Sequence, residues 1–291
     1  MLNTHTHTHT HTHTRQVSAT KAVLTRDKED DAKLAKGIKL AIDKGVIAAS
    51  VTVEPTTKID VIGKTADQVA DEIVKKLGKA PSQGCVVVLQ GLSGTGKGTT
   101  VKKLKELLPK ATTWSNGNVF RSLTLLAATW CEQNGDCDLD KALTPKNLDS
   151  FVKMLTFDKF DGEFDVNVKG LGLDLMVSKV QNTILKSKKV GKNIPTVAEF
   201  TQGEVIQFVS NATKLMAQDG FNVLVEGRAQ TLNYLRTPHR FELVLSDENV
   251  IGERRAAQRI AALALNNVKG DTNDDVQSAV ESALNELKDE K

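Results

Sequence analysis

The sequence contains no apolar run that approaches the roughly eighteen residues needed to cross a bilayer as a helix. The N-terminus also lacks the apolar core of a secretory signal. We therefore expect a cytoplasmic protein that has no membrane partner. A sustained basic stripe, as found in nucleic-acid-binding proteins, is missing too, because 39 basic and 36 acidic residues are mixed along the chain. Nucleic acid is therefore not an expected partner.

Cysteine is scarce, and no internal repeat recurs at a fixed period. Cys85, Cys131 and Cys137 are odd in number and show no C-x-x-C spacing, so we expect free thiols. The chain does contain an ordinary share of apolar residues, 40% of 291 positions. Such a chain can bury one sizeable core with an inserted lobe, or two small domains.

Residues 1–16 are a histidine-threonine segment that cannot build a core. Its composition is typical of a purification tag or a low-complexity tail. The alternative is a weak Zn or Ni site, because a period of two places all the imidazoles on one face of an extended segment. The alternating histidines are His5, His7, His9, His11 and His13.

Residues 17–80 form a second segment with its own helix and strand patterns. Apolar residues at helical spacing predict a helix over Asp27–Lys44. Ala49–Val53 and Lys58–Ile62 have the pattern of strands, and Thr65–Leu77 that of a second helix capped by Thr65.

Residues 81–291 alternate between apolar runs and amphipathic segments, which predicts an α/β fold with a parallel sheet covered by helices on both faces. The expected strands are Val86–Leu89, Ala111–Trp114, Asn222–Glu226 and Arg240–Leu245. The expected helices are Thr99–Leu108, Asn118–Glu132, Ile251–Leu265 and Asn273–Lys288.

The stretch of about residues 133–220 interrupts this alternation and is expected to form an inserted lobe. Phe157–Val168 alternates around Asp161-Gly162, which is a hairpin signal. Two helical segments follow before Gly220.

The stretch CVVVLQGLSGTGKGTT, from Cys85 to Thr100, has the pattern of a phosphate-binding loop. Its glycines let backbone N–H groups approach an anion, and the following helix N-terminus offers partial positive charge and free donors. ATP is the expected ligand, although an ordinary strand-to-helix turn is the alternative reading. The strict pattern GxxxxGK[ST] is met as far as Lys97 and is then broken by Gly98. The expected cofactor-binding residues are Gly91, Ser93, Gly94, Thr95, Gly96, Lys97, Gly98, Thr99 and Thr100.

With these motifs in place, the chain resembles the cytidylate kinase family of nucleoside monophosphate kinases, from about Cys85 to Ala262. The loop GLSGTGKGT is similar to the family's loop, including the glycine after the lysine. NGNVFR, ending at Arg121, looks like the signature before the family's apolar helix. VLVEGR, ending at Arg228, resembles its acid-glycine-arginine segment. The inserted lobe corresponds to the family's acceptor-binding insert, and residues 248–265 to its mobile lid.

The resemblance implies phosphoryl transfer from ATP with Mg²⁺ to a small-molecule acceptor, and it assigns roles to single residues. Glu226 and Thr99 would hold the metal, with an ion pair to an arginine as the alternative role of Glu226. The acceptor would be bound by Asn116, Phe120, Arg121 and Arg228. The catalytic charges would be Lys97, Arg228, Arg255 and Arg259, with Arg254 on the same lid helix; a solvated helix face is the alternative reading of the lid arginines.

Departures from the family pattern gather on the acceptor side. Ala229 stands where an aspartate follows the family's glycine-arginine pair, Phe120 replaces a tyrosine, and Asn116 replaces a serine. Val180–Thr183 and Pro195–Ala198 stand where the insert's arginines would be. Because a pocket built on hydrogen bonds discriminates strongly, these changes predict an altered acceptor.

The resemblance also implies one more strand and helix after the lid, whereas the C-terminus offers a helix and no apolar run. Lys58–Leu77 looks like that missing strand-turn-helix, placed ahead of the loop, so we expect a circular permutation. An unrelated N-terminal appendage is the alternative. Two further functional readings stay open: an ATP-binding structural or regulatory protein without catalysis, and a kinase of a non-nucleotide metabolite.

Overall fold

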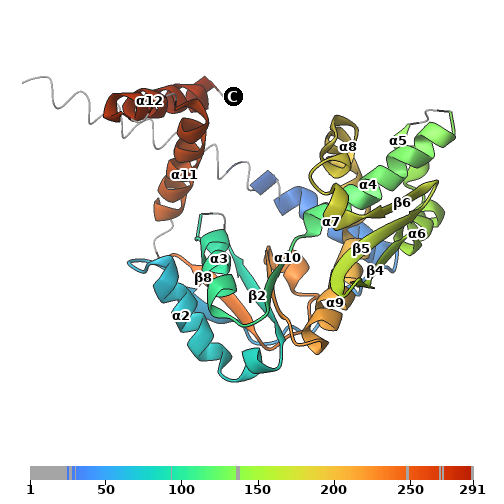
Figure 1. The fold of residues 1–291 in the computed structure, drawn as a ribbon, viewed down its shortest axis with the longest axis horizontal. Coiled ribbons are helices and arrows are strands. Elements are labelled where there is room, and N and C mark those ends of the chain that lie inside the picture. The colour runs from blue at the N-terminus through green and yellow to red at the C-terminus, as the bar shows by residue number, and fades with distance from the viewer. Residues whose placement is uncertain are drawn as a thin grey trace, which may run out of the picture.

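A five-stranded, fully parallel sheet forms the centre of the molecule, in the order β1-β8-β2-β7-β3 (Figure 1). The structure, a computed structural model, describes residues 31–92, 94–135, 138–246, 249–268, 270 and 272–289, with Thr25, Lys28 and Glu29. The strands are β1 (Thr57–Asp60), β2 (Cys85–Gly91), β3 (Ala111–Trp114), β7 (Asn222–Gly227) and β8 (Arg240–Val244). The α/β class expected from the sequence is therefore confirmed.

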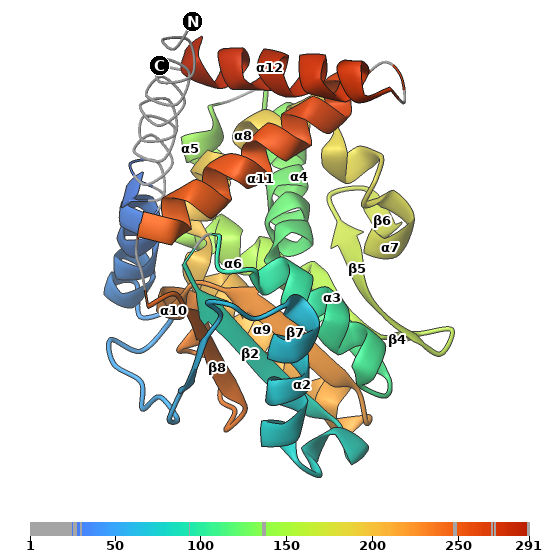
Figure 2. The same ribbon diagram turned by 90° about the vertical axis from the view of Figure 1, so that its left-hand side faces the viewer.

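Helices cover both faces of this sheet, so each central strand is buried on two sides. One face packs against α2 (Ala66–Leu77) and α3 (Lys97–Leu107), which lie over the sheet in Figure 2. The core on this face contains Ile73 and Leu104. The other face packs against α4 (Asn116–Gln133), α9 (Gln202–Gln218) and α10 (Ala229–Leu232). This burial explains why β2 and β7 are near-continuous apolar runs.

Strand β2 divides its side chains between the two faces in strict alternation. Val87 and Leu89 belong to the core under α2 and α3, whereas Val88 belongs to the core under α4 and α9. Because alternate residues of a strand share a face, Gln90 points to the same side as Val88. This last polar residue of β2 therefore faces the layer that contains α4 and α10.

The N-terminal segment contributes the edge strand of the sheet. β1 pairs in parallel with β8, with Ile59 opposite Leu243, and the Ile59 side chain is fully buried. α2 follows with the capping box at Thr65 that the sequence predicts. The predicted strand Ala49–Val53 is wrong: these residues have no strand structure, because the edge position beside β8 is already filled by β1. The chain before β1 contains a helix over residues 31–43 that packs on α9.

The region between α4 and β7 forms an antiparallel sheet with short helices around it. The predicted hairpin is present, with positive φ at Asp161 and Gly162. A third strand that the sequence did not reveal completes the order β4-β5-β6. The last helix of this region, α9, packs on β2 and β7. It therefore belongs to the helical layer that covers the central sheet. The elements are α5 (Leu139–Ala142), α6 (Pro145–Lys153), β4 (Leu155–Phe160), β5 (Glu163–Gly170), β6 (Leu173–Met176), α7 (Val177–Val180), α8 (Lys188–Phe200) and the 3₁₀ turns η1 (Ala80–Ser82) and η2 (Ile184–Lys186).

Two helices end the chain, α11 (Asn249–Asn267) and α12 (Asn273–Asp289). They pack on each other around Ala264, Ala279 and Ala283, in an apolar cluster of their own (Figure 1). After β8 the described residues contain no further strand. Within the described part of the chain, no helix combines the length and apolar character that a membrane crossing requires.

Candidate functional site

The loop between β2 and α3 has the backbone that its glycines allow. Gly91, Gly94 and Gly96 all have positive φ, at 148°, 88° and 88°. At Gly91 no side chain fits, because a Cβ atom would lie 2.5 Å from the carbonyl oxygen of Leu243 on β8. Gly96 is the N-cap of α3 and provides no side chain to bond the first N–H groups of the helix. Those donors therefore point out of the helix end, as an anion site requires.

Lys97 lies across the loop. Its Nζ donates to the carbonyl oxygens of Gly91 and Leu92, at 2.8 and 2.9 Å. The ammonium is thus held above the end of β2, beside the helix N-terminus. Positive charge and helix dipole act together here, which favours a bound anion.

The threonines of the loop divide into buried and exposed positions. Thr95 is buried and its hydroxyl donates to Leu92 O at 2.9 Å, which fixes the turn. Thr100 is also buried, at 2% exposure, whereas Thr99 is exposed at the start of α3. Of the two helix threonines, only Thr99 offers its hydroxyl to solvent. Ser93, a further predicted cofactor residue, lies outside the described residues.

Glu226, at the carboxyl end of β7, lies beside the start of α3. It is in register with Leu89 of β2, and a Cβ atom at Gly98 would lie 3.9 Å from its Oε2. The glycine after Lys97 therefore leaves room between the helix and this exposed carboxylate. The predicted pairing of Glu226 with the loop is thus brought together by the β2–β7 register.

A metal ion would need further ligands besides Glu226. The described residues contain no group of three His, Cys, Asp or Glu side chains that could hold one. Mg²⁺ commonly binds through one or two carboxylates, waters and substrate phosphates. The residues present, Glu226 and the Thr99 hydroxyl, fit that mode and would hold the ion together with a nucleotide's oxygens.

Arg228 follows β7 and is paired with the N-terminal helix. Its Nη1 lies 2.5 Å from Oδ1 of Asp31, and both side chains are about one-third exposed. The sequence did not reveal Asp31 as a partner, because 197 positions separate the two residues. The arginine assigned to an acceptor's phosphate is therefore bound to a carboxylate of its own chain.

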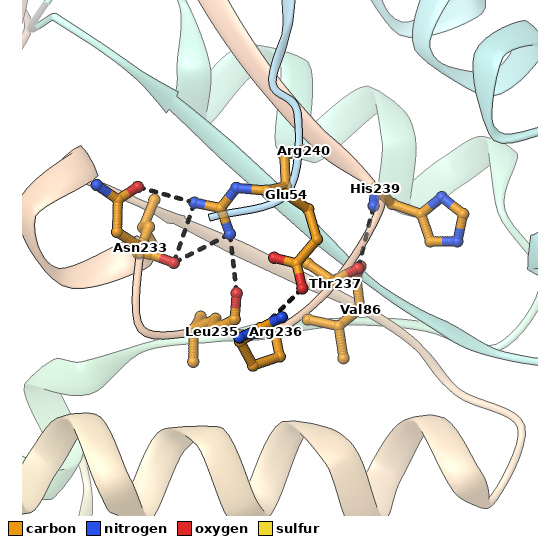
Figure 3. A network of polar contacts seen from close by, with 9 residues as sticks. Glu54, Val86, Asn233, Leu235, Arg236, Thr237, His239 and Arg240 are labelled. Atoms are coloured by element: carbon orange, nitrogen blue, oxygen red, sulfur yellow. Dashed lines mark hydrogen bonds and ion pairs between the residues drawn. The ribbon is translucent and has the colours of Figure 1, made fainter. Parts of the chain in front are cut away.

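A buried arginine fixes the segment that follows Arg228. Arg240 is 1% exposed, and its guanidinium donates to the carbonyl oxygens of Leu232 and Leu235 and to Oδ1 of Asn233 (Figure 3). These acceptors lie at the C-terminal end of α10, where helix carbonyls lack intrahelical partners. Arg240 thus anchors α10 and, through it, the position of Arg228 at its N-cap.

The first turns of α4 hold the second predicted acceptor group. Arg121 Nη1 donates to Asn118 Oδ1 at 3.3 Å, and Asn118 Nδ2 donates to Gln181 Oε1 at 3.0 Å. This chain links α4 to the segment after α7. Asn116 accepts a hydrogen bond from the Trp114 indole at 3.0 Å, and Phe120 packs against the neighbouring core.

A cavity of about 300 Å³ lies between the end of β3, the start of α4 and the three-stranded sheet. Three aromatic rings define its apolar side: Trp114 and Phe157 meet edge to face at 5.4 Å, and Phe157 stacks on Phe164 at 5.3 Å. Asp165 and Gln181 provide polar groups in its lining. A flat, partly polar molecule matches this combination, because aromatic faces favour stacking and a few polar groups fix orientation.

The predicted lid corresponds to α11. Arg259 lies on this helix and is half-buried. The side chains of Arg254 and Arg255 lie outside the described part of the structure.

A scan against protein-family models gives no match, and a search of curated proteins gives no match either. Only the candidate site itself therefore indicates the function of this chain.

Sequence reasoning missed the groups that only the fold brings to the site. Asp31 comes from the N-terminal helix, and Asp165 and Phe164 come from a hairpin whose sequence looks purely structural. Asn118 lies inside the NGNVFR motif, between Asn116 and Arg121. Its place in the motif could have indicated that its side chain belongs to the site.

Proposed function

We propose that the protein is an ATP-dependent phosphotransferase related to cytidylate kinases, which transfers the ATP γ-phosphate to a nucleoside monophosphate or a related small acceptor. The observation that carries the proposal is the Lys97–Gly98–Glu226 arrangement. A lysine above a glycine-rich loop, a helix N-terminus and a carboxylate meet at the carboxyl edge of the sheet, which is where ligands bind in open α/β folds.

The chemistry expected of these groups is positioning and charge stabilisation, because phosphoryl transfer needs little covalent participation by the protein. The loop backbone and Lys97 would hold the β- and γ-phosphates. Glu226 and Thr99 would hold Mg²⁺, which supplies positive charge to the phosphate oxygens when bound. Arg228 and Arg121 would bind the anionic part of the acceptor.

The cavity lined by Trp114, Phe157 and Phe164 supports a planar acceptor on the side of the insert. Its polar groups differ from the arginines that the family resemblance implies, since Gln181 stands at this place. We therefore propose an acceptor other than CMP as the preferred substrate.

The strand order supports the proposed circular permutation. β1 precedes the loop in sequence, yet it extends the sheet beyond β8, the position expected for a strand that follows the lid. We propose that residues 17–80 complete the kinase core.

One observation favours a second candidate, an ATP-binding protein without transfer activity. The Arg228 charge is matched by Asp31, so an anionic acceptor must compete with a carboxylate already in place.

An ADP-release assay with MgATP and a panel of nucleoside monophosphates and small hydroxyl compounds separates the candidates. Acceptor-dependent ADP release that Lys97→Ala abolishes supports the kinase. ATP binding without any acceptor-dependent release supports the second candidate, and failure to bind MgATP contradicts both.

A further inference from the structure

Gln90 is a buried polar residue at the end of a strand whose preceding residues are apolar. It ends β2, and its side chain is 7% exposed. Its Oε1 is fully buried and has no hydrogen-bond partner, and among the described residues its amide nitrogen has none either. Burying such a group without partners costs on the order of 1–3 kcal/mol, and most buried side-chain polar atoms avoid that cost.

The residues before Gln90 on β2 are apolar, from Val86 to Leu89, and they face the apolar run Val223–Val225 on β7. Glu242 of β8 stands opposite Gln90 itself. An ionised carboxylate only accepts hydrogen bonds, so it cannot pair with the carboxamide oxygen. A buried polar side chain beside β2 is bonded: Thr237, just before β8, donates its hydroxyl to Val86 O at 2.6 Å (Figure 3).

Gln90 lies at a position suited to a residue that contacts the substrate. It immediately precedes Gly91, the first glycine of the loop, so it lies at the edge where parallel strands direct ligands. Its side chain shares the face of Val88, which packs with the layer that contains α4 and α10. Arg121 lies on α4, and Arg228 is the N-cap of α10. Gln90 therefore lies on the face of the sheet that contains the proposed acceptor groups. Glu226 lies on the opposite face, beside α3.

We propose that Gln90 is a specificity residue for the acceptor, and that its carboxamide oxygen accepts a hydrogen bond from a hydroxyl or amino group of that molecule. The inference rests on the proposed kinase function and adds a requirement to it: the acceptor has a hydrogen-bond donor near the group that receives the phosphate. A site that reserves a buried polar group in this way strongly rejects analogues that cannot pair with it.

The test compares Gln90→Met, which keeps size and removes the carboxamide, with Thr237→Val as a matched control. We expect Gln90→Met to raise the melting temperature, because it removes an unpaired buried polar group. Thr237→Val should lower it, because it removes a formed hydrogen bond. The MgATP-induced shift of the melting temperature should stay unchanged in both.

Steady-state kinetics with different acceptors test whether Gln90 contributes to recognition of the acceptor. With AMP, CMP, GMP and UMP as probes, we expect Gln90→Met to lower kcat/KM for the best acceptor by about 10-fold or more, whereas Thr237→Val leaves it within twofold. A Gln90→Met enzyme with unchanged kcat/KM overturns the inference while the kinase function stands, and a lowered melting temperature would indicate a structural role instead.

The two proposals can fail separately. If the parent protein transfers phosphate to none of the four nucleotides, the kinase function fails for this class of acceptor, and thermal shifts then decide the role of Gln90. A nucleotide-induced shift that Gln90→Met removes supports Gln90 as a binding group, and the absence of any such shift in the parent overturns it.

Discussion

The Asp31 carboxylate lies 2.5 Å from Nη1 of Arg228, across 197 positions of sequence. One partner belongs to the helix over residues 31–43 and the other follows the central strand β7. The pair therefore links the N-terminal segment to the proposed acceptor site, and it places a negative charge where an acceptor's phosphate would bind.

Removing the negative charge of Asp31 should strengthen binding of the acceptor. We expect Asp31→Asn to lower the acceptor KM while the free energy of unfolding changes little, because partly exposed ion pairs contribute little to stability. Arg228→Ala should instead lower turnover on the order of 10²-fold, as the loss of one preorganised charge donor does. The measurement is steady-state ADP release at varied acceptor concentration.

Asp43→Asn is the matched control, because Asp43 lies on the same helix and forms an exposed ion pair with Lys39. It should leave KM unchanged. An acceptor KM that rises in Asp31→Asn would contradict the competition between carboxylate and acceptor.

MgATP should raise the melting temperature of the parent protein, because a ligand that binds only the folded state stabilises it by mass action. Lys97→Ala should remove most of this shift, whereas Lys105→Ala, an exposed lysine near the other end of α3, should retain it. The measurement is a thermal melt at increasing MgATP. A parent protein that does not respond to saturating MgATP would refute the phosphate-loop interpretation.

The N-terminal segment should be required for the fold. Deleting residues 1–16 should be harmless, whereas deleting residues 1–80 removes β1, exposes the edge of β8 and should give insoluble protein. Ile59→Ala should cost about 2–4 kcal/mol in chemical denaturation, because its side chain is fully buried.

The control for this change is Ile62→Ala, since Ile62 is 40% exposed and should lose far less stability. A soluble fragment of residues 81–291 that unfolds cooperatively and binds ATP would show that the segment is an appendage.

The acceptor preference should depend on position 229, which lies at the start of α10 next to Arg228. We expect CMP to be a poor substrate of the parent protein and Ala229→Asp to improve CMP turnover relative to the best other acceptor. Competition assays with paired nucleotides measure that ratio. If CMP is the best substrate of the unchanged protein, the acceptor site has the specificity of a cytidylate kinase, and the proposed change of acceptor is wrong.

The stability of the fold should fall in alkaline solution because of Cys85. Burial raises the pKa of this thiol from 9.0 to about 11. Between these two values the unfolded chain ionises the thiol and the folded chain does not, so the unfolded state binds fewer protons and the free energy of unfolding falls as pH rises. Denaturation of the parent and of Cys85→Ala from pH 8 to pH 11 measures the effect. The slope difference between the two should vanish below about pH 9, and equal slopes throughout would show that Cys85 titrates normally.

The glycine-rich turn after β2 and the α/β class could be predicted from the sequence because their causes are local. Glycines at Gly91, Gly94 and Gly96 permit a backbone that few other residues adopt, and apolar runs of strand length mark buried strands wherever they occur. The hairpin at Asp161-Gly162 was predicted for the same reason, since turn residues act on their own neighbours.

The segment Ala49–Val53 shows where local patterns fail. Its β-branched residues favour a strand, but a strand needs a partner, and the position beside β8 belongs to β1. Only the tertiary structure decides which of two similar segments pairs, because the sheet has a limited number of edges.

By itself the sequence determined the loop, its lysine and the identity of the strands around it, because each depends on residues that are adjacent in the chain. The tertiary structure alone decided that Asp31 meets Arg228, that Gly98 leaves space for Glu226, and that Gln90 is buried without a partner. Those relationships arise from strand register and from the packing of distant helices, which bring together residues whose separation in sequence contains no signal of their contact.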